Sequence, residues 1–140
     1  MNFVLDASVA LLWLVPETNP AGVDYASATL KALRESQAVV PSLFALEVAN
    51  VAAKVESKGV VTEADVQRFI ALLGRLNIVT DQATSAHALG DTLNLARRYK
   101  LSAYDAAYLE LSLRTGLPLA TLAAHPVSYT HLTLPTSDLG

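Results

Sequence analysis

The sequence predicts an α/β fold of three layers, with a central parallel sheet of about four or five strands flanked by helices. Short apolar runs alternate with longer segments of helical periodicity, in the order strand, helices, strand, helices, strand, helices, strand. The 140 residues are 52% hydrophobic and 16% charged, which suits one compact domain with a sizeable core. Strands joined by helical crossovers pair in parallel, and their connections are right-handed.

The first strand and helices are predicted in the first quarter of the chain. Residues 2–5 form a short apolar run typical of a buried strand, and residues 8–15 a brief apolar helix that Pro16 ends. Residues 22–36 show helical spacing and predict a helix with one buried face. The side chains predicted on that face are Val23, Ala26, Leu30 and Leu33.

The same order of elements follows in the middle of the chain. Residues 38–40 predict a second strand, and a helix then runs to about residue 57 with Ser42 as its N-cap. Residues 62–65 have the form of a capping box and begin another helix. The buried stripe predicted for that helix is Val66, Phe69, Ile70 and Leu73.

Two more strands and two helices complete the pattern. Residues 77–80 predict the third strand, and residues 83–99 and 103–115 predict helices. After Gly116, residues 117–122 are strand-like.

Three carboxylates lie at the strand-to-helix joints of this pattern. Asp6 closes the first apolar run, Glu47 lies just inside the helix after the second strand, and Asp105 begins the helix at 103–115. Carboxyl ends of parallel strands, and the helix starts after them, meet at one edge of the sheet. Clustered carboxylates persist by sharing protons or by binding a cation, and an all-oxygen donor set favours Mg²⁺ or Mn²⁺. Phosphoryl chemistry is the reaction class such an ion serves.

Each acid also has a purely structural interpretation. Asp105 follows Ser102 in a Ser-x-x-Asp capping pattern, so its carboxylate could serve the helix end alone. Asp6 could turn the chain after a strand, and Glu47 could face solvent.

Four segments together resemble a known family, the PIN domain, and more narrowly the VapC-type toxins of bacterial toxin-antitoxin pairs. The segments are Val-Leu-Asp6-Ala-Ser8, Pro41-Ser-Leu-Phe-Ala-Leu-Glu47-Val-Ala-Asn50, Leu-Ser-Ala-Tyr-Asp105-Ala-Ala-Tyr108 and Leu-Pro-Leu-Ala-Thr121-Leu. The resemblance extends from the start of the chain to about residue 122. It implies a PIN-like fold and a metal-dependent endoribonuclease that hydrolyses RNA through an ion-activated water, without a covalent intermediate.

The resemblance also implies roles for individual residues. Ser8 matches the small hydroxyl residue that accompanies the first acid, and Thr121 matches a polar residue at the end of the last motif. Asn50, one helical turn after the second acid, is expected to support it by hydrogen bonding, although a helix-surface Asn is equally consistent with the pattern. The residues expected to hold Mg²⁺ or Mn²⁺ and to carry catalysis are Asp6, Glu47 and Asp105.

Contacts to RNA are predicted from local charge, because a net charge of -3 argues against binding by bulk positive charge. Arg97, Arg98 and Lys100 form a small basic group shortly before Asp105 and could contact backbone phosphates. The alternative is that these cations favour a helix C-terminus through its dipole. His87, a lone helical histidine, is expected to be structural rather than catalytic.

The expected partners follow from the resemblance. They are an RNA substrate, a cognate antitoxin that packs over the acidic site and a second copy of the chain in a homodimer. The apolar first fifteen residues lack a basic start and include Asp6, so neither a secretion signal nor a membrane anchor is expected. We therefore expect a cytoplasmic protein.

The chain departs from the family pattern near its end. Ala123 stands where the family usually places a fourth acid, which predicts weaker occupancy of a second metal. Residues 1–125 are expected to form a truncated PIN domain, and residues 126–140 a non-native tail that resembles a translated sequencing adaptor. Two alternatives follow: a PIN-like protein that binds RNA or a partner with weak or no catalysis, and another metal-dependent phosphohydrolase on an α/β scaffold.

Overall fold

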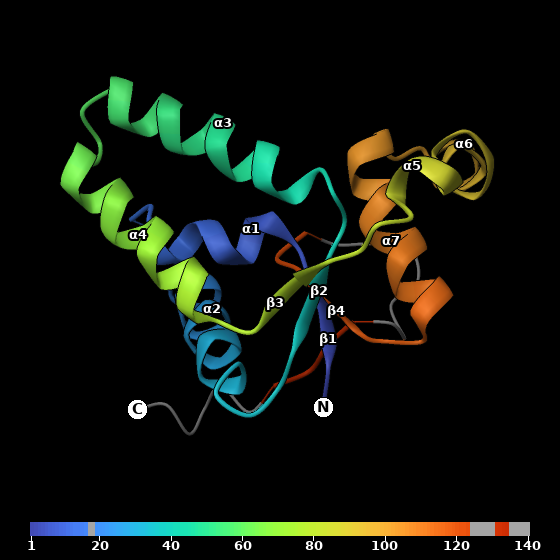
Figure 1. Cartoon of the computed structure of the whole chain (residues 1–140), viewed down its shortest axis with the longest axis horizontal. Helices are drawn as coiled ribbons and strands as arrows, with labels where there is room; N and C mark the ends of the chain where they lie inside the picture. Colours follow the sequence, from blue (N-terminus) through green and yellow to red (C-terminus); the bar gives the residue numbers. More distant parts are fainter. Residues whose placement is uncertain (17–18, 124–130, 135–140) are drawn as a thin grey trace.

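A four-stranded parallel sheet forms the centre of the molecule, in a computed structural model that describes residues 1–16, 19–123 and 131–134. The strand order is β3-β2-β1-β4. This confirms the predicted α/β fold with a parallel sheet flanked by helices (Figure 1). The strands are β1 (Phe3–Leu5), β2 (Ala38–Val40), β3 (Ile78–Thr80) and β4 (Leu119–Ala120).

The central strand β1 pairs with two neighbours and is buried on both faces. Val4 lies opposite Val39 of β2 and Leu119 of β4. Phe3, Val4 and Leu5 are at most 1% exposed, as expected for a continuous apolar run in a parallel sheet. Asp6, the polar residue that follows β1, therefore lies at the carboxyl edge of the sheet.

The helices lie on the two sides of the sheet, with α1 to α4 on one side and α5 to α7 on the other (Figure 1). Within α7, seven consecutive residues from Ala106 to Ser112 are buried, so the middle of this helix is covered on all its faces. The helices are α1 (Ala7–Ala10), the 3₁₀ turn η1 (Leu11–Trp13), α2 (Pro20–Ala32), α3 (Phe44–Ser57), α4 (Glu63–Arg75), α5 (Thr84–His87), the π-helical segment η2 (Ala88–Thr92), α6 (Leu93–Tyr99) and α7 (Ala103–Thr115).

Two predicted helix features are wrong in detail. Ser42 does not cap α3, because its N–H donates to Thr84 Oγ1 at 2.9 Å and the helix begins at Phe44. The helix predicted over residues 83–99 is interrupted by η2, where the backbone widens to a π turn.

Two side chains predicted in the core are exposed. Val23 is 39% exposed, because the buried stripe of α2 runs instead through Ala26, Thr29 and Leu33. Ile70 is 58% exposed and lines an apolar groove of about 440 Å³ between α3 and α4. Val23 and Ile70 therefore lie outside the hydrophobic core.

Residues 131–134 lie beside β4. His131 pairs with Leu119 in a parallel bridge, and the N–H of Leu132 donates to the carbonyl of Leu119 at 2.8 Å. Leu132 is 3% exposed, and its carbonyl accepts from the Tyr25 hydroxyl at 2.6 Å. A segment of the predicted non-native tail thus covers the edge of β4. The rest of that tail, residues 126–130 and 135–140, lies outside the described residues, and its foreign origin stays a prediction.

Within the described ranges, no helix is both long and apolar enough to cross a membrane.

Candidate metal centre

Asp6 is held at the carboxyl end of β1 by donors from two parts of the chain. Its Oδ2 accepts hydrogen bonds from Thr121 Oγ1 at 2.6 Å and from Ser8 Oγ at 3.1 Å. Its Oδ1 accepts from the Ser8 N–H at 3.4 Å, which caps α1. The bonds from Ser8 are local and would suffice for a residue that only turns the chain. The bond from Thr121, which follows β4, is a tertiary contact that such a role does not explain.

Glu47 lies in the first turn of α3 and is held by a buried tyrosine of α7. The Tyr108 hydroxyl donates to Glu47 Oε1 at 2.6 Å, and Tyr108 is 1% exposed. Glu47 itself is only partly exposed. The hydrogen bond therefore draws the carboxylate toward α7 rather than into solvent.

Asp105 occupies the first turn of α7, and a second helix shows what its sequence pattern can do. At α4, the Asp65 carboxylate accepts from the Thr62 N–H at 2.9 Å, which completes a capping box. At α7, Ser102 Oγ accepts from the Asp105 N–H at 3.0 Å, but the reciprocal bond is not made. Among the described residues, none donates a hydrogen bond to the Asp105 carboxylate. Helix capping thus uses the backbone of Asp105 and leaves its side chain free.

A small cavity brings residues of three elements together. Its lining includes Asp6, Asp105, Tyr108, Thr121 and Ala123. The volume is about 30 Å³, which admits an ion or a water molecule and excludes an organic ligand.

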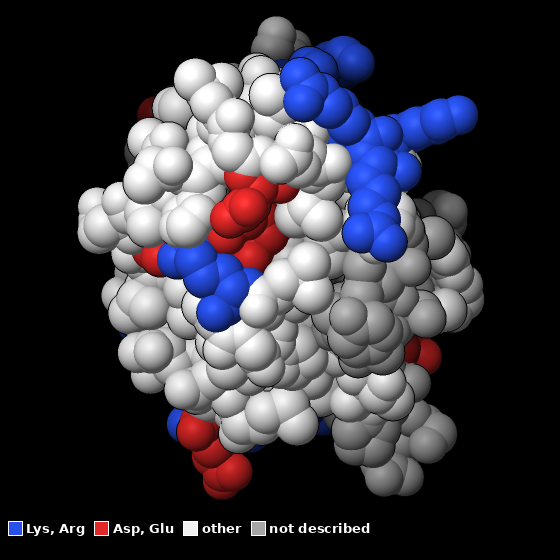
Figure 2. Space-filling model, turned by 90° about the vertical axis from the view of Figure 1, so that its right-hand side faces the viewer, with Lys and Arg blue, Asp and Glu red and all other residues white. Residues whose placement is uncertain are grey.

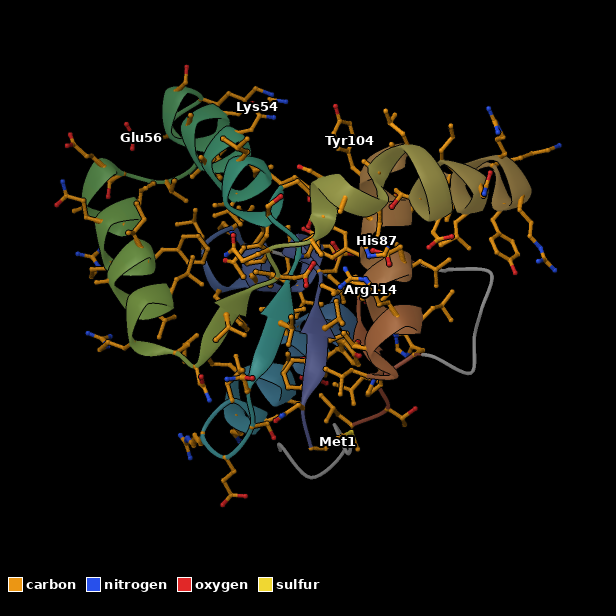
Figure 3. The ribbon with its side chains drawn as sticks, turned by 45° about the vertical axis from the view of Figure 1, so that its right-hand side comes forward. Met1, Lys54, Glu56, His87, Tyr104 and Arg114 are labelled. Atoms are coloured by element: carbon orange, nitrogen blue, oxygen red, sulfur yellow. The ribbon has the colours of Figure 1, made fainter. Side chains whose placement is uncertain are left out.

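A wider groove of about 400 Å³ runs along Glu47. Asn50 lines this groove, but in the described part of the chain it makes no hydrogen bond with Glu47, since it is exposed one turn further along α3. Tyr104 also lines the groove and is 63% exposed. Its ring points away from the body of the molecule (Figure 3).

The pKa values of Asp6 and Glu47 respond to burial and to the negative charges near them. Burial raises the pKa of Asp6 above its usual range, against the lowering effect of its hydrogen bonds, and the charge of Asp105 adds to the rise. Burial also raises the pKa of Glu47, and the charges of Asp6 and Asp105 raise it further. The pKa of Tyr108 is raised by burial and by its bond to Glu47, so its hydroxyl stays a donor.

These residues fit a hard divalent ion. The donor set is carboxylate oxygen, and a cation would relieve the repulsion that raises the pKa of both Asp6 and Glu47. The ligand atoms of the three acids do not all lie within 4.8 Å of one another in the described chain. The arrangement is therefore open rather than a closed cage, which suits Mg²⁺, an ion that keeps several of its waters.

Replacing Glu47 by glutamine is expected to stabilise the metal-free protein at neutral pH. Because the folded-state pKa of Glu47 lies above its unfolded value, its contribution to stability is full at low pH and is lost as the pH rises through the folded-state pKa. Glu47→Gln removes the charge and keeps an acceptor for Tyr108. Thermal melts without metal should show a higher Tm than wild type at about pH 7 and equal values near pH 4. Exposed Glu35→Gln is the control, and a Tm gain that persists at low pH would argue against charge burial as the cause.

The predicted basic group lies apart from the acids. Arg97, Arg98 and Lys100 are exposed at the C-terminal end of α6, and the Arg98 guanidinium stacks over the Tyr99 ring at 5.3 Å. These residues line neither the cavity nor the groove. Figure 2 shows basic side chains gathered on the upper part of the face formed by α5 to α7, beside a central acidic group.

Tyr108 and Tyr104 were not among the predicted site residues. A signal for Tyr108 exists in the sequence, because it lies three residues after Asp105 and so shares its helix face. Its partner Glu47 lies 61 positions away, and no local pattern indicates that contact.

Asp6, at the carboxyl end of β1, places the candidate centre at the sheet edge where open α/β folds bind their ligands. The PIN domain family model matches residues 3–122, and the chain therefore belongs to the PIN domain family. No curated protein matches the chain. Among solved structures, the chain is similar in fold to that titled "Crystal structure of PAE2754 from Pyrobaculum aerophilum", with 23% identity, a TM-score of 0.58, and coverage of 88% of this chain and 83% of that one.

Proposed function

We propose that this protein is the toxin of a toxin-antitoxin pair and acts as a Mg²⁺- or Mn²⁺-dependent endoribonuclease. The observation that carries the proposal is the convergence of Asp6, Glu47 and Asp105 from three separate elements. Two of these carboxylates have raised pKa values, and the third has a free side chain in the described chain. A divalent cation bound among these carboxylates would relieve the repulsion that contributes to the raised pKa values.

Each residue of the site has a defined task in this proposal. Asp6, Glu47 and Asp105 would hold the ion, which when bound activates water and neutralises charge on the leaving oxygen of a phosphodiester. Thr121 and Ser8 orient Asp6, and because both donate to its carboxylate they favour the ionised form that binds a cation. Tyr108 does the same for Glu47.

The substrate surface in this proposal combines the groove and the basic group. The exposed Tyr104 ring, next to Asp105, offers a face on which a base can stack. Leu46, which is 75% exposed, adds apolar surface in the same groove. The basic group at the end of α6 would contact the backbone further along the strand. Single-stranded RNA suits such a surface, because its bases are free to stack.

Cleavage of matched RNA and DNA strands tests the proposal. The protein is incubated with end-labelled single-stranded RNA and the DNA of the same sequence, in Mg²⁺ or Mn²⁺. We expect faster cleavage of the RNA, with 5′-phosphate and 3′-hydroxyl ends, because attack by water leaves no cyclic phosphate. Cyclic phosphate ends would identify a contaminating metal-independent ribonuclease. Faster cleavage of DNA would support the broader phosphohydrolase alternative.

The antitoxin and the homodimer belong to the same proposal. An acidic site with raised carboxylate pKa values is complementary to a basic side chain, which a partner segment can supply. Induction of the chain in a bacterial host should arrest growth, and co-expression of a small neighbouring gene product should relieve the arrest. Arrest that persists in Asp105→Asn would separate toxicity from the acidic site.

A binding protein with weak or no catalysis is the second candidate. The observation that favours it is Ala123, which lines the cavity beside Asp6 and Asp105 without a carboxylate of its own. Titration with Mn²⁺ distinguishes the two, because a purely binding protein should show little affinity for the ion.

A further inference from the structure

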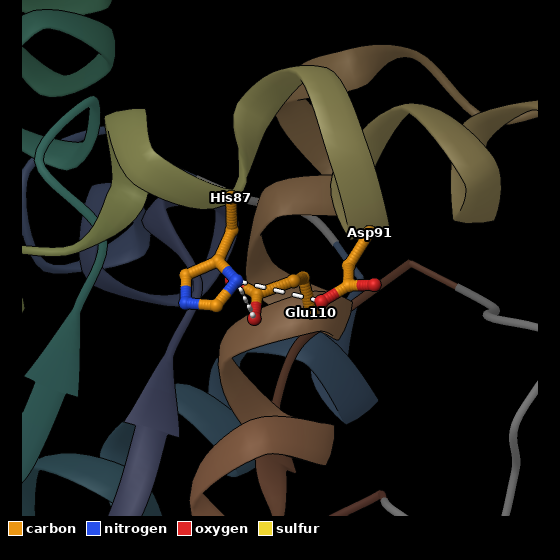
Figure 4. A group of neighbouring side chains, drawn as sticks. All are labelled: His87, Asp91 and Glu110. Carbon is orange, nitrogen blue, oxygen red and sulfur yellow. Dashed lines mark ion pairs between the residues drawn. The ribbon is translucent and has the colours of Figure 1, made fainter.

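A second group of possible metal ligands lies outside the acidic cavity. It consists of His87 at the end of α5, Asp91 in η2 and Glu110 on α7 (Figure 4). His87 Nδ1 is 3.4 Å from Asp91 Oδ2 and 3.9 Å from Glu110 Oε2. One ligand atom of each residue lies within 4.8 Å of the other two.

The spacing of these atoms suits a shared ion better than direct hydrogen bonds. Both distances from Nδ1 exceed the roughly 2.7–3.2 Å of a well-formed N–H···O bond. Ligands bonded to zinc at about 2.0–2.2 Å lie roughly 2.8–3.6 Å apart at octahedral or tetrahedral angles. The distance from His87 Nδ1 to Asp91 falls in this range. The distance to Glu110 exceeds the range by about 0.3 Å, which a small rotation of the side chains would remove.

The local charge also favours a divalent cation. Arg114 pairs with Glu110 at 2.7 Å and with Asp81 at 2.8 Å, so its single positive charge serves two carboxylates. Asp91 adds a third carboxylate. With His87 neutral, the four charged side chains carry a net charge of -2. One divalent ion would balance this charge.

One ligand of this group is buried and held in place, and another is exposed to solvent. The Glu110 side chain is 5% exposed, and Arg114 fixes it through both carboxylate oxygens. Each carboxylate oxygen has a second lone pair, so Oε2 can serve Arg114 and an ion together. The Asp91 side chain is 73% exposed and leaves the position accessible from solvent. Figure 3 labels His87, at the end of α5, and Arg114, on α7.

We propose that His87, Asp91 and Glu110 bind a borderline divalent ion such as Zn²⁺ or Ni²⁺, at a site separate from the acidic cavity. The imidazole ligand distinguishes this site from the all-carboxylate centre, because nitrogen ligands favour these ions over Mg²⁺. The ion fastens α5 and η2 to α7, the helix that carries Asp105 five residues before Glu110. Its role is structural.

Zn²⁺ titration of the whole chain in excess Mg²⁺ tests this site, because Mg²⁺ competes for the carboxylate centre. We expect Zn²⁺ binding in wild type, and binding at least tenfold weaker in His87→Gln and in Asp91→Asn. Asp91 is exposed, so its variant should fold normally. Asp24→Asn, another exposed acid, is the matched control and should bind as wild type does.

Thermal melting supplies a readout independent of activity. Zn²⁺ should raise the Tm of wild type and of Asp24→Asn, and should leave the Tm of Asp91→Asn unchanged. Equal Zn²⁺ affinity in wild type and His87→Gln overturns the proposal. A wild-type protein that binds no Zn²⁺ and whose Tm does not respond to the ion also overturns it.

Discussion

Asp105→Asn is expected to reduce RNA cleavage by roughly a hundredfold or more without unfolding the protein. A metal-bound carboxylate supplies several kcal/mol of stabilisation where charge develops, and each ~1.4 kcal/mol is a factor of ten in rate. The substitution keeps the backbone N–H that Ser102 caps, and the exposed carboxylate has no hydrogen-bond donor in the described chain. Mn²⁺ affinity should fall with activity, and EDTA should abolish the cleavage that remains.

Asp65→Asn is the matched control for this variant. Asp65 follows Thr62 in the same three-residue spacing, but its carboxylate completes the capping box of α4. Its substitution should weaken that capping bond, lower the Tm slightly and leave the cleavage rate unchanged. If Asp105→Asn instead lost stability and kept its activity, Asp105 would be a capping residue and the acidic centre would lack its third ligand.

Ala123→Asp is expected to tighten Mn²⁺ binding by roughly tenfold to a hundredfold, because a carboxylate within a few ångströms attracts a divalent ion strongly in a partly buried site. Ala123 lines the cavity with Asp6 and Asp105, and its N–H donates to Thr121 Oγ1 at 3.1 Å. A side chain added here extends from a backbone already fixed beside Asp6. RNA cleavage should increase together with Mn²⁺ affinity.

The control for this gain is Ala123→Asn, which has nearly the same shape and no charge. It should bind Mn²⁺ as wild type does. Ala123→Asp should also melt at a lower temperature than Ala123→Asn when metal is absent, because a fourth negative charge adds to the repulsion among Asp6, Glu47 and Asp105. Equal Mn²⁺ affinity in both variants would show that position 123 does not reach the ion.

Much of the fold was predictable because its signals are local. The apolar run before Asp6 and the one before the α3 helix identify β1 and β2, and their place before helices predicts the parallel sheet. The sequence could not distinguish the two capping patterns, since Thr62-x-x-Asp65 and Ser102-x-x-Asp105 are chemically alike. Only the tertiary surroundings decide that one carboxylate bonds back to its helix and the other does not.

Other features depended on contacts between distant parts of the chain. The bond from Tyr108 to Glu47 and the pairing of Arg114 with Asp81 join elements that the sequence separates by dozens of residues. The exposure of Ile70 depends on how closely α3 and α4 approach, which helical periodicity does not determine. The π-helical segment η2 likewise has no clear sequence pattern, since its residues satisfy ordinary helical spacing.

The burial of the middle of α7 on all its faces limits how the length of this chain can change during evolution. One residue inserted between Asp105 and Glu110 would rotate the two ends of the helix by about 100° relative to each other. Tyr108 bonds to Glu47 and Arg114 pairs with Asp81, both outside the helix, and the surface from Ala106 to Ser112 is enclosed. The helix therefore cannot rotate without breaking these contacts. Insertions and deletions among relatives should therefore collect in the loops around α7, and its register should stay constant.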